Sequence, residues 1–403
     1  MENYVVQTNE KKERQLFFES GVYDDGFEVL KDYLNSNYAS CKVCFISCSQ
    51  DYLLYKAFVE KLSVQGIYIL SDDVATNNNL LEVQNVCADC DLLVCLDYSS
   101  VNYCKKMQTK LKINCFYFFA SVPPIDVFLP FFHEFDGKQY SLVACNSVKS
   151  YIINYTDAKS TSRQGLIPCF CSLIAYYCAF LDCYINSYLF SKKLDETFSS
   201  RFERFSNLLS NALNQIRFMP SNFVDNLYAL TLDFVDFALE ENITNLPSMC
   251  LSSVYIYLTK QKVSTQEVAM FASQIFVHLY SDFFAKFKHF SNTGVNIQKK
   301  QEMYKKYLKS DYFVDEGRKE KEQTSYLLMR FSKKLQQKCA SFCTLVDKFV
   351  DKLLDLYEDS GYSLYKNFDK DKILLALYFV PDLIKDKSLL HILCDYGILD
   401  SIV

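Results

Sequence analysis

Short, continuously apolar runs alternate with segments of helical periodicity through the first third of the chain, and this alternation limits the possible folds most. The apolar runs are typical of buried strands and lie at 43–47, 67–70, 92–96 and 115–119. Residues 27–34 and 53–65 have apolar side chains at helical spacing. Strands that are apolar on both faces need helices on both sides of their sheet. The pattern predicts an open, mostly parallel, Rossmann-like α/β sheet.

After about residue 157 the strand signals end and helical periodicity dominates. Two further strand candidates, 141–145 and 151–155, precede this change. The segments that favour helix are 166–188, 202–216, 224–239, 251–259, 264–290 and 327–357. We therefore predict an α/β domain at 1–157 and an all-helical domain at 158–403, which fits the length of 403 residues. The Lys- and Glu-rich segment 298–322 favours a solvated helix or a connection.

Charge and hydropathy exclude several classes of protein. The net charge of −5 argues against a nucleic-acid binder that neutralises phosphates. The first residues show no cationic flank followed by an apolar run, so no signal peptide is expected. The longest apolar stretch, 167–181, is too short to span a membrane. We expect a cytoplasmic protein with no membrane span and no nucleic-acid partner.

Glycine, histidine and cysteine limit the chemistry. The two closest of the nine glycines, Gly21 and Gly26, are five residues apart, so no glycine-rich phosphate loop exists. The four histidines, at positions 133, 278, 289 and 391, are few for a catalytic metal site. The 17 cysteines include two CxxC pairs, at 41/44 and 87/90, whose separation does not suit a zinc ribbon. Core thiols are the favoured interpretation.

Three segments carry a resemblance to a known superfamily. Residues 90–106 join the strand 92–96 to Asp97-Tyr98-Ser99-Ser100 and a helical segment. Residues 119–126 read Phe-Ala-Ser-Val-Pro-Pro-Ile-Asp, and 384–399 read Ile-Lys-Asp-Lys-Ser-Leu-Leu-His-Ile-Leu-Cys-Asp-Tyr-Gly-Ile-Leu. In order and spacing they resemble the glycerol-1-phosphate dehydrogenase branch of the iron-containing alcohol dehydrogenase and dehydroquinate synthase superfamily, from about residue 20 to the C-terminus.

The resemblance implies a dehydroquinate synthase-like fold in which NAD(P) lies on the α/β domain, with its pyrophosphate on a glycine loop. The loop and neighbouring cofactor positions fall on Asp97, Tyr98, Ser99, Ser100, Lys106 and Ser121. The family glycines are lost there. A carboxylate at Asp97 about 4 Å from a diphosphate costs roughly 4 kcal/mol at an effective dielectric constant near 20. Lys106 matches the helix cation of the family, with an exposed helix lysine as the alternative.

The family's divalent metal, zinc, iron or nickel, is held by the helical domain and polarises the substrate hydroxyl. By resemblance its ligand positions appear here as Ser172, Val268 and Tyr280, with His278 as an alternative if the register slips. His278 has an ordinary interpretation as a core or rim histidine. Asp126 is kept at a family position near the substrate pocket, and an equal alternative is that it caps the helix starting near residue 127.

The leading hypothesis is a degenerate, catalytically inactive homologue, a pseudoenzyme that needs neither NAD(P) nor metal. It would act by binding a small polar ligand or a hetero-partner, and the superfamily resemblance implies a homodimer. The alternative is a working NAD(P)-dependent polyol-phosphate oxidoreductase, acting on CH–OH groups, with an altered site. A third interpretation is an unrelated helical scaffold that resembles the family by chance. It predicts that 92–96 is not a central parallel strand with 97–100 at its C-terminal end.

Overall fold

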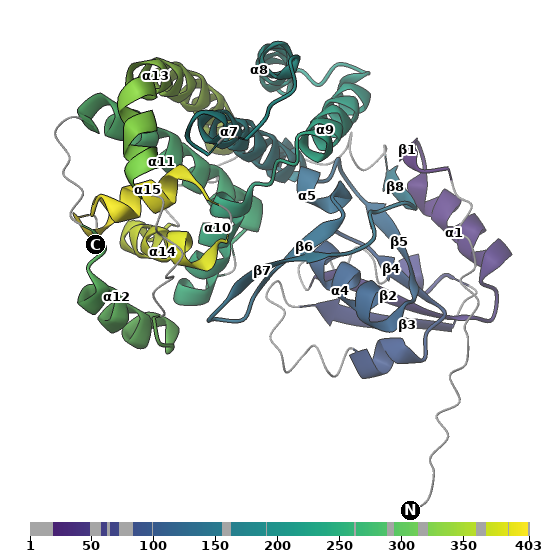
Figure 1. Cartoon of the computed structure of the whole chain (residues 1–403). Helices are drawn as coiled ribbons and strands as arrows, with labels where there is room; N and C mark the ends of the chain where they lie inside the picture. The colour runs from purple at the N-terminus through teal and green to yellow at the C-terminus, as the bar shows by residue number, and fades with distance from the viewer. Residues whose placement is uncertain are drawn as a thin grey trace, which may run out of the picture. The chain divides into compact units, whose positions relative to one another are not determined.

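The computed structural model describes two compact units (Figure 1). The described residues are 19–48, 58–62, 65–71, 84–98, 100–154, 163–190, 192–261, 263–287, 294–312, 321–359, 368–385 and 387–401. The α/β unit comprises Met1–Ala120 and Cys145–Thr156, and the helical unit comprises Ser121–Ala144 and Asp157–Val403. The single boundary predicted at residue 157 misses the segment 121–144, which belongs to the helical unit.

A six-stranded parallel sheet forms the α/β unit, in the order β1-β8-β5-β4-β2-β3. Its strands are β1 (Gly21–Tyr23), β2 (Lys42–Cys48), β3 (Gln65–Ser71), β4 (Leu92–Cys95), β5 (Asn114–Phe119) and β8 (Tyr151–Asn154). Strand β4 pairs with β2 on one side and β5 on the other, and residues 97–100 follow its C-terminal end. The predicted α/β sheet is confirmed, and the chance-resemblance interpretation is wrong on this point.

Helices α1 (Gly26–Asn37) and α4 (Val101–Leu111) belong to this unit. Leu30 and Leu34 of α1 pack on side chains of the sheet, including Phe116 and Ile152. The helix begins close to β8, because a Cβ atom on Gly26 would meet Cγ2 of Ile152 at 2.7 Å. Glycine is therefore required at this approach. Of the helix predicted at 53–65, residues 53–57, 63 and 64 lie outside the described residues; 58 and 59 are helical, and 65 already belongs to β3.

The helical unit begins with a short helix and a hairpin. Helix α5 (Ile125–Phe128) is followed by β6 (Phe131–Phe135) and β7 (Tyr140–Ala144), which pair antiparallel as a separate two-stranded sheet. The strand predicted at 141–145 therefore forms, but outside the parallel sheet. Gly137 allows the hairpin turn, since its φ of +92° is one that residues with a side chain rarely adopt.

Buried apolar faces hold the remaining helices together. They are α7 (Ile167–Leu189), α8 (Phe198–Gln215), α9 (Phe223–Glu240), α10 (Leu246–Thr259), α11 (Thr265–Lys286), α12 (Ile297–Met303), α13 (Lys321–Asp359), α14 (Lys370–Leu383) and α15 (Leu389–Asp395), with a π-helical turn at Tyr304–Leu308. Helix α7 packs against α11 and α13, with Tyr177 stacked on Phe202 and Phe342. Helix α12 agrees with the predicted alternative of a helix in the segment 298–322, whereas α14 and α15 were not predicted.

Two helices are long and apolar enough to cross a membrane. In α7 the most apolar window is 89% buried inside the protein, and in α11 it is 61% buried. Both are core helices of the helical unit. The apolar stretch 167–181 was expected to be too short to span a membrane. The helix that contains it, α7, is longer than this stretch and has 23 residues.

A buried ion pair joins α12 to α14. Lys300 is fully buried, and its ammonium group donates hydrogen bonds to the Asp382 carboxylate and, at 2.7 Å, to the carbonyl oxygen of Tyr378. Its Nζ atom also lies 4.1 Å from the centre of the Tyr378 ring, a cation–π distance. The prediction that the segment 298–322 is solvated is therefore wrong at Lys300, because this lysine belongs to the core.

Replacing Lys300 alone should strongly destabilise the helical unit. Lys300→Met leaves the buried Asp382 carboxylate with the Tyr304 hydroxyl at 3.4 Å but without a cation, and removal of one member of such an ion pair costs about 3–5 kcal/mol. Lys305→Met is the matched control, because Lys305 and Asp311 are 3.9 Å apart with side chains 63% and 64% exposed, and it should cost under about 1 kcal/mol. Urea unfolding measures both, and equal costs would contradict the prediction.

Candidate functional site

The loop between β4 and α4 holds a buried carboxyl group. Asp97 is 4% exposed, and its Oδ1 atom accepts a hydrogen bond of 2.8 Å from the backbone N–H of Ser100, the N-cap residue of α4. A helix N-terminus after a parallel strand is where backbone N–H groups bind phosphate in dinucleotide folds. Here a side chain of the protein itself takes one of those donors.

The other predicted cofactor residues lie in different surroundings. Ser100 and Lys106 are buried, whereas Tyr98 is half-buried. The interpretation of Lys106 as an exposed helix lysine is wrong, since it is 9% exposed. Ser121 belongs to the helical unit and donates a hydrogen bond of 3.0 Å to the carbonyl oxygen of Gly165. Ser99 lies outside the described residues.

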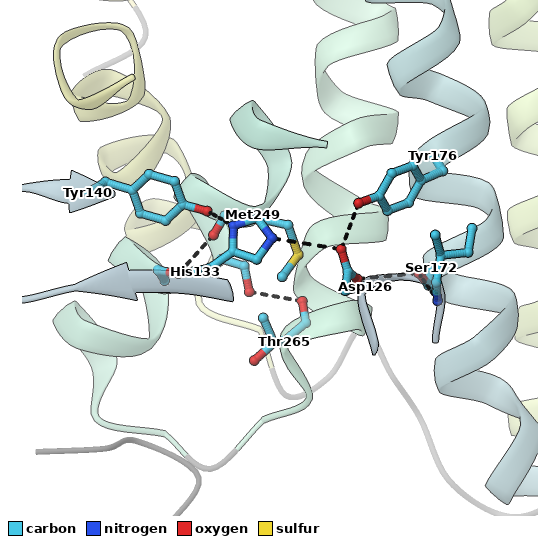
Figure 2. A network of polar contacts seen from close by, with 10 residues as sticks. Asp126, His133, Tyr140, Ser172, Tyr176, Met249 and Thr265 are labelled. Carbon is cyan, nitrogen blue, oxygen red and sulfur yellow. Dashed lines mark hydrogen bonds and ion pairs between the residues drawn. The ribbon is translucent and has the colours of Figure 1, made fainter. Parts of the chain in front are cut away.

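Asp126 is the centre of a buried polar network in the helical unit (Figure 2). Its Oδ1 atom accepts a hydrogen bond of 2.9 Å from the Tyr176 hydroxyl, and its Oδ2 atom accepts one of 3.4 Å from Ser172. The Ser172 hydroxyl oxygen in turn accepts the backbone N–H of Ile125 at 3.1 Å. The alternative role of Asp126 as a helix cap is wrong, because Pro124 is the N-cap of α5 and the Asp126 side chain bonds to α7.

The hairpin brings His133 to the same network. Its Nε2 atom lies 3.8 Å from Oδ1 of Asp126, with the two side chains 4% and 9% exposed. On the other side of the ring, Nδ1 forms a hydrogen bond with the Tyr140 hydroxyl (Figure 2). Burial raises the pKa of Tyr140 and of Tyr176 well above their usual value, with the Asp126 charge adding to the effect, so both hydroxyls stay protonated.

Sequence reasoning counted His133 among four histidines and gave it no role. Its alternation with apolar neighbours in β6 gives no sign of a polar partner. The partner comes from the hairpin register, in which His133 pairs with Leu142 and Phe135 pairs with Tyr140. His133 and Tyr140 are therefore diagonal neighbours on one face, close enough for two rings to meet.

The positions that the resemblance assigns to metal ligands do not suit a divalent metal. Val268 is fully buried and has no ligand atom, and Ser172 is hydrogen-bonded within the Asp126 network. His278 is 52% exposed and pairs with Asp347 at 2.9 Å, which makes it a rim histidine. Across the part of the chain that the structure describes, no three His, Cys, Asp or Glu side chains are placed to hold a metal ion.

Tyr280 lies beside an unusual carboxyl group. Burial raises the pKa of Asp182 on α7 to about 7, and the nearby Tyr280 hydroxyl limits the rise. Oδ1 of Asp182 and the Tyr280 hydroxyl are buried and have no hydrogen-bond partner among the described residues. The pair supplies one carboxyl and one hydroxyl group, which is a poor set of ligands for a transition metal.

The fold has well-defined relatives among solved structures, although no family model and no curated protein matches the sequence. An NADH-dependent butanol dehydrogenase from Thermotoga maritima is similar with a TM-score of 0.57 and 11% identity, covering 95% of this chain and 96% of that one. An iron-containing alcohol dehydrogenase from Thermococcus thioreducens has a TM-score of 0.55 and 8% identity, covering 96% and 98%. The chain has the iron-containing alcohol dehydrogenase fold.

A probable glycerol dehydrogenase from Sinorhizobium meliloti has the same fold, with a TM-score of 0.55, 9% identity and 95% coverage of both chains. The predicted fold class, a Rossmann-like α/β domain followed by a helical domain, is confirmed by these neighbours. The iron-containing alcohol dehydrogenase fold thus extends over nearly the whole chain. At this identity the likeness concerns the fold, and the chemistry has to be argued from the side chains.

Asp182 should make stability depend on pH. The unfolded chain releases this proton near pH 4, whereas the folded protein keeps it to about pH 7. The folded state binds more protons between these values, so the contribution of Asp182 to stability falls as the pH rises from about 4 to about 7. Asp182→Asn should remove this loss and raise the free energy of unfolding at pH 8 by up to about 4 kcal/mol, with little change at pH 4.

Urea unfolding between pH 4 and pH 8 measures this effect. Asp282→Asn on α11 is the control, because the Asp282 side chain is 74% exposed, and its profile should run parallel to that of the wild type. A parallel profile for Asp182→Asn as well would contradict the prediction.

Proposed function

We propose that this chain is a degenerate member of the iron-containing alcohol dehydrogenase and glycerol-1-phosphate dehydrogenase superfamily that has lost hydride transfer. It acts in the cytoplasm by binding a small polar ligand or a partner subunit, and works without NAD(P) or a divalent metal. The observation that carries the proposal is the buried carboxylate of Asp97 at the start of α4.

Asp97 opposes a dinucleotide in two ways. Its carboxylate accepts the Ser100 N–H, which removes a donor from the set that would bind a pyrophosphate. Its negative charge repels a second anion, by roughly 4 kcal/mol at about 4 Å with an effective dielectric constant near 20. Repulsion of this size corresponds to about a thousandfold in affinity.

The helical unit supports the same proposal independently. A metal that polarises a hydroxyl group needs several carboxylate or imidazole ligands. At the positions assigned by resemblance, the chain has a hydroxyl group at Ser172, an apolar side chain at Val268 and a phenol at Tyr280. None of the three is an ordinary ligand of zinc, iron or nickel in a dehydrogenase-type site.

Metal analysis and NADH titration of the wild-type protein test the proposal. Protein purified from cells supplemented with zinc, iron and nickel should carry these metals well below one per chain. Titration followed by NADH fluorescence should give a Kd of about 1 mM or above, since the repulsion described above offsets about half of the roughly 8 kcal/mol that a micromolar complex gains. Stoichiometric metal together with micromolar NADH affinity would favour the working NAD(P)-dependent oxidoreductase and overturn the proposal.

Removing the charge at position 97 should improve NADH binding. Asp97→Asn keeps the Oδ1 acceptor for the Ser100 N–H but loses the negative charge, so NADH affinity should rise at least about tenfold. The control is Asp91→Asn, an exposed position directly before β4 whose carboxylate accepts the Lys42 N–H at 3.0 Å, where affinity should not change. Equal NADH affinity for wild type and Asp97→Asn would show that this charge is not the barrier.

A further inference from the structure

We propose that the Asp126–His133 network, defined as Asp126, His133, Tyr140, Ser172 and Tyr176, holds the helical unit together in place of a metal centre. The inference rests on the proposed function in one respect, the absence of a bound metal. It goes beyond that function by assigning a role to a histidine that neither the sequence pattern nor the resemblance pointed to. The elements involved are drawn in Figure 2.

The polar groups that a metal ion would need as ligands are already hydrogen-bonded to one another in the network. Ser172 stands where the resemblance places a carboxylate ligand, and it donates to Asp126 while accepting from the Ile125 N–H. Tyr176, one helical turn further along α7, donates to the same carboxylate and is fully buried. Asp126 thus receives two hydroxyl donors from α7, and charge-assisted hydrogen bonds of this kind are stronger than neutral ones.

His133 supplies the other side of the network. The imidazole ring lies between the Tyr140 hydroxyl at Nδ1 and the Asp126 carboxylate, 3.8 Å from Nε2. At this separation Nε2 makes no hydrogen bond to a described residue. When Nδ1 accepts the Tyr140 hydroxyl proton, Nε2 carries the ring proton, and this N–H is attracted to the Asp126 carboxylate more strongly in the interior than it would be in water.

The network links segments that are distant in the sequence. Asp126 lies on α5, and His133 and Tyr140 lie on the hairpin. The two α7 residues that donate to Asp126 are 46 and 50 residues away from it. A structural metal acts in the same manner, by tying together the elements that carry its ligands. Because the side chains of the network are buried, removing one takes a hydrogen-bond or electrostatic partner away from its neighbours in the core.

A double-mutant cycle in the full-length protein tests this role. His133→Phe keeps the ring, which packs against Phe131 at 5.7 Å, but removes both nitrogens. Asp126→Asn removes the charge. Each variant should lower Tm by about 5 °C or more, and the double variant should lose clearly less than the sum. His278→Phe is the matched control, an exposed histidine–carboxylate pair, and should shift Tm by less than about 2 °C.

The metal component has a separate measurement. Adding EDTA or zinc chloride to the wild-type protein should leave Tm unchanged. If Asp126→Asn does not fold, Tyr176→Phe replaces it in the cycle, because it keeps the carboxylate and removes one donor. Additive effects, or a His133→Phe shift no larger than the control, would overturn the network alone. A fall of Tm in EDTA with stoichiometric metal would overturn both the network and the metal-free part of the proposed function.

Discussion

Helix α7 is buried on nearly every side, and this burial determines which partners the polar groups of the helical unit need. A polar side chain on the buried face of such a helix has no water to bond with, so it needs a partner inside the protein. Ser172 and Tyr176 meet this need through Asp126. Asp182 meets it by holding its proton to about pH 7. The same constraint thus yields a hydrogen-bonded carboxylate in one place and a protonated carboxyl group in another.

Two buried carboxylates, one in each unit, are bound by the protein's own donors. Asp97 accepts the backbone N–H of Ser100 at the start of a helix, where an anionic ligand would otherwise be favoured. Asp126 accepts hydroxyl groups of α7 beside an imidazole, where a cation would otherwise be favoured. In both cases a group of the protein itself makes the interactions that a bound anion or cation could otherwise make.

The α/β unit could be predicted from the sequence because its signal is local. Continuous apolar runs such as 92–96 become parallel strands when helices cover both faces, and β4 lies at the centre as expected. The hairpin and the role of His133 could not be predicted, because they depend on which residues meet across a turn. The loss of the loop glycines was visible, whereas the hydrogen bond from Ser100 to Asp97 required coordinates.

A fold can outlast its chemistry only if the interactions that the chemistry supplied to stability are replaced. A helical unit that lost metal ligands would keep their partners buried and unsatisfied, at a cost of about 1–3 kcal/mol for each group. A short hydroxyl group at Ser172 avoids a second buried negative charge beside Asp126, and Tyr176 and His133 complete its surroundings. Among the residues that the structure describes, Ser172, Tyr176 and His133 thus surround the Asp126 carboxylate with internal partners, and the proposed metal-free state follows from this arrangement.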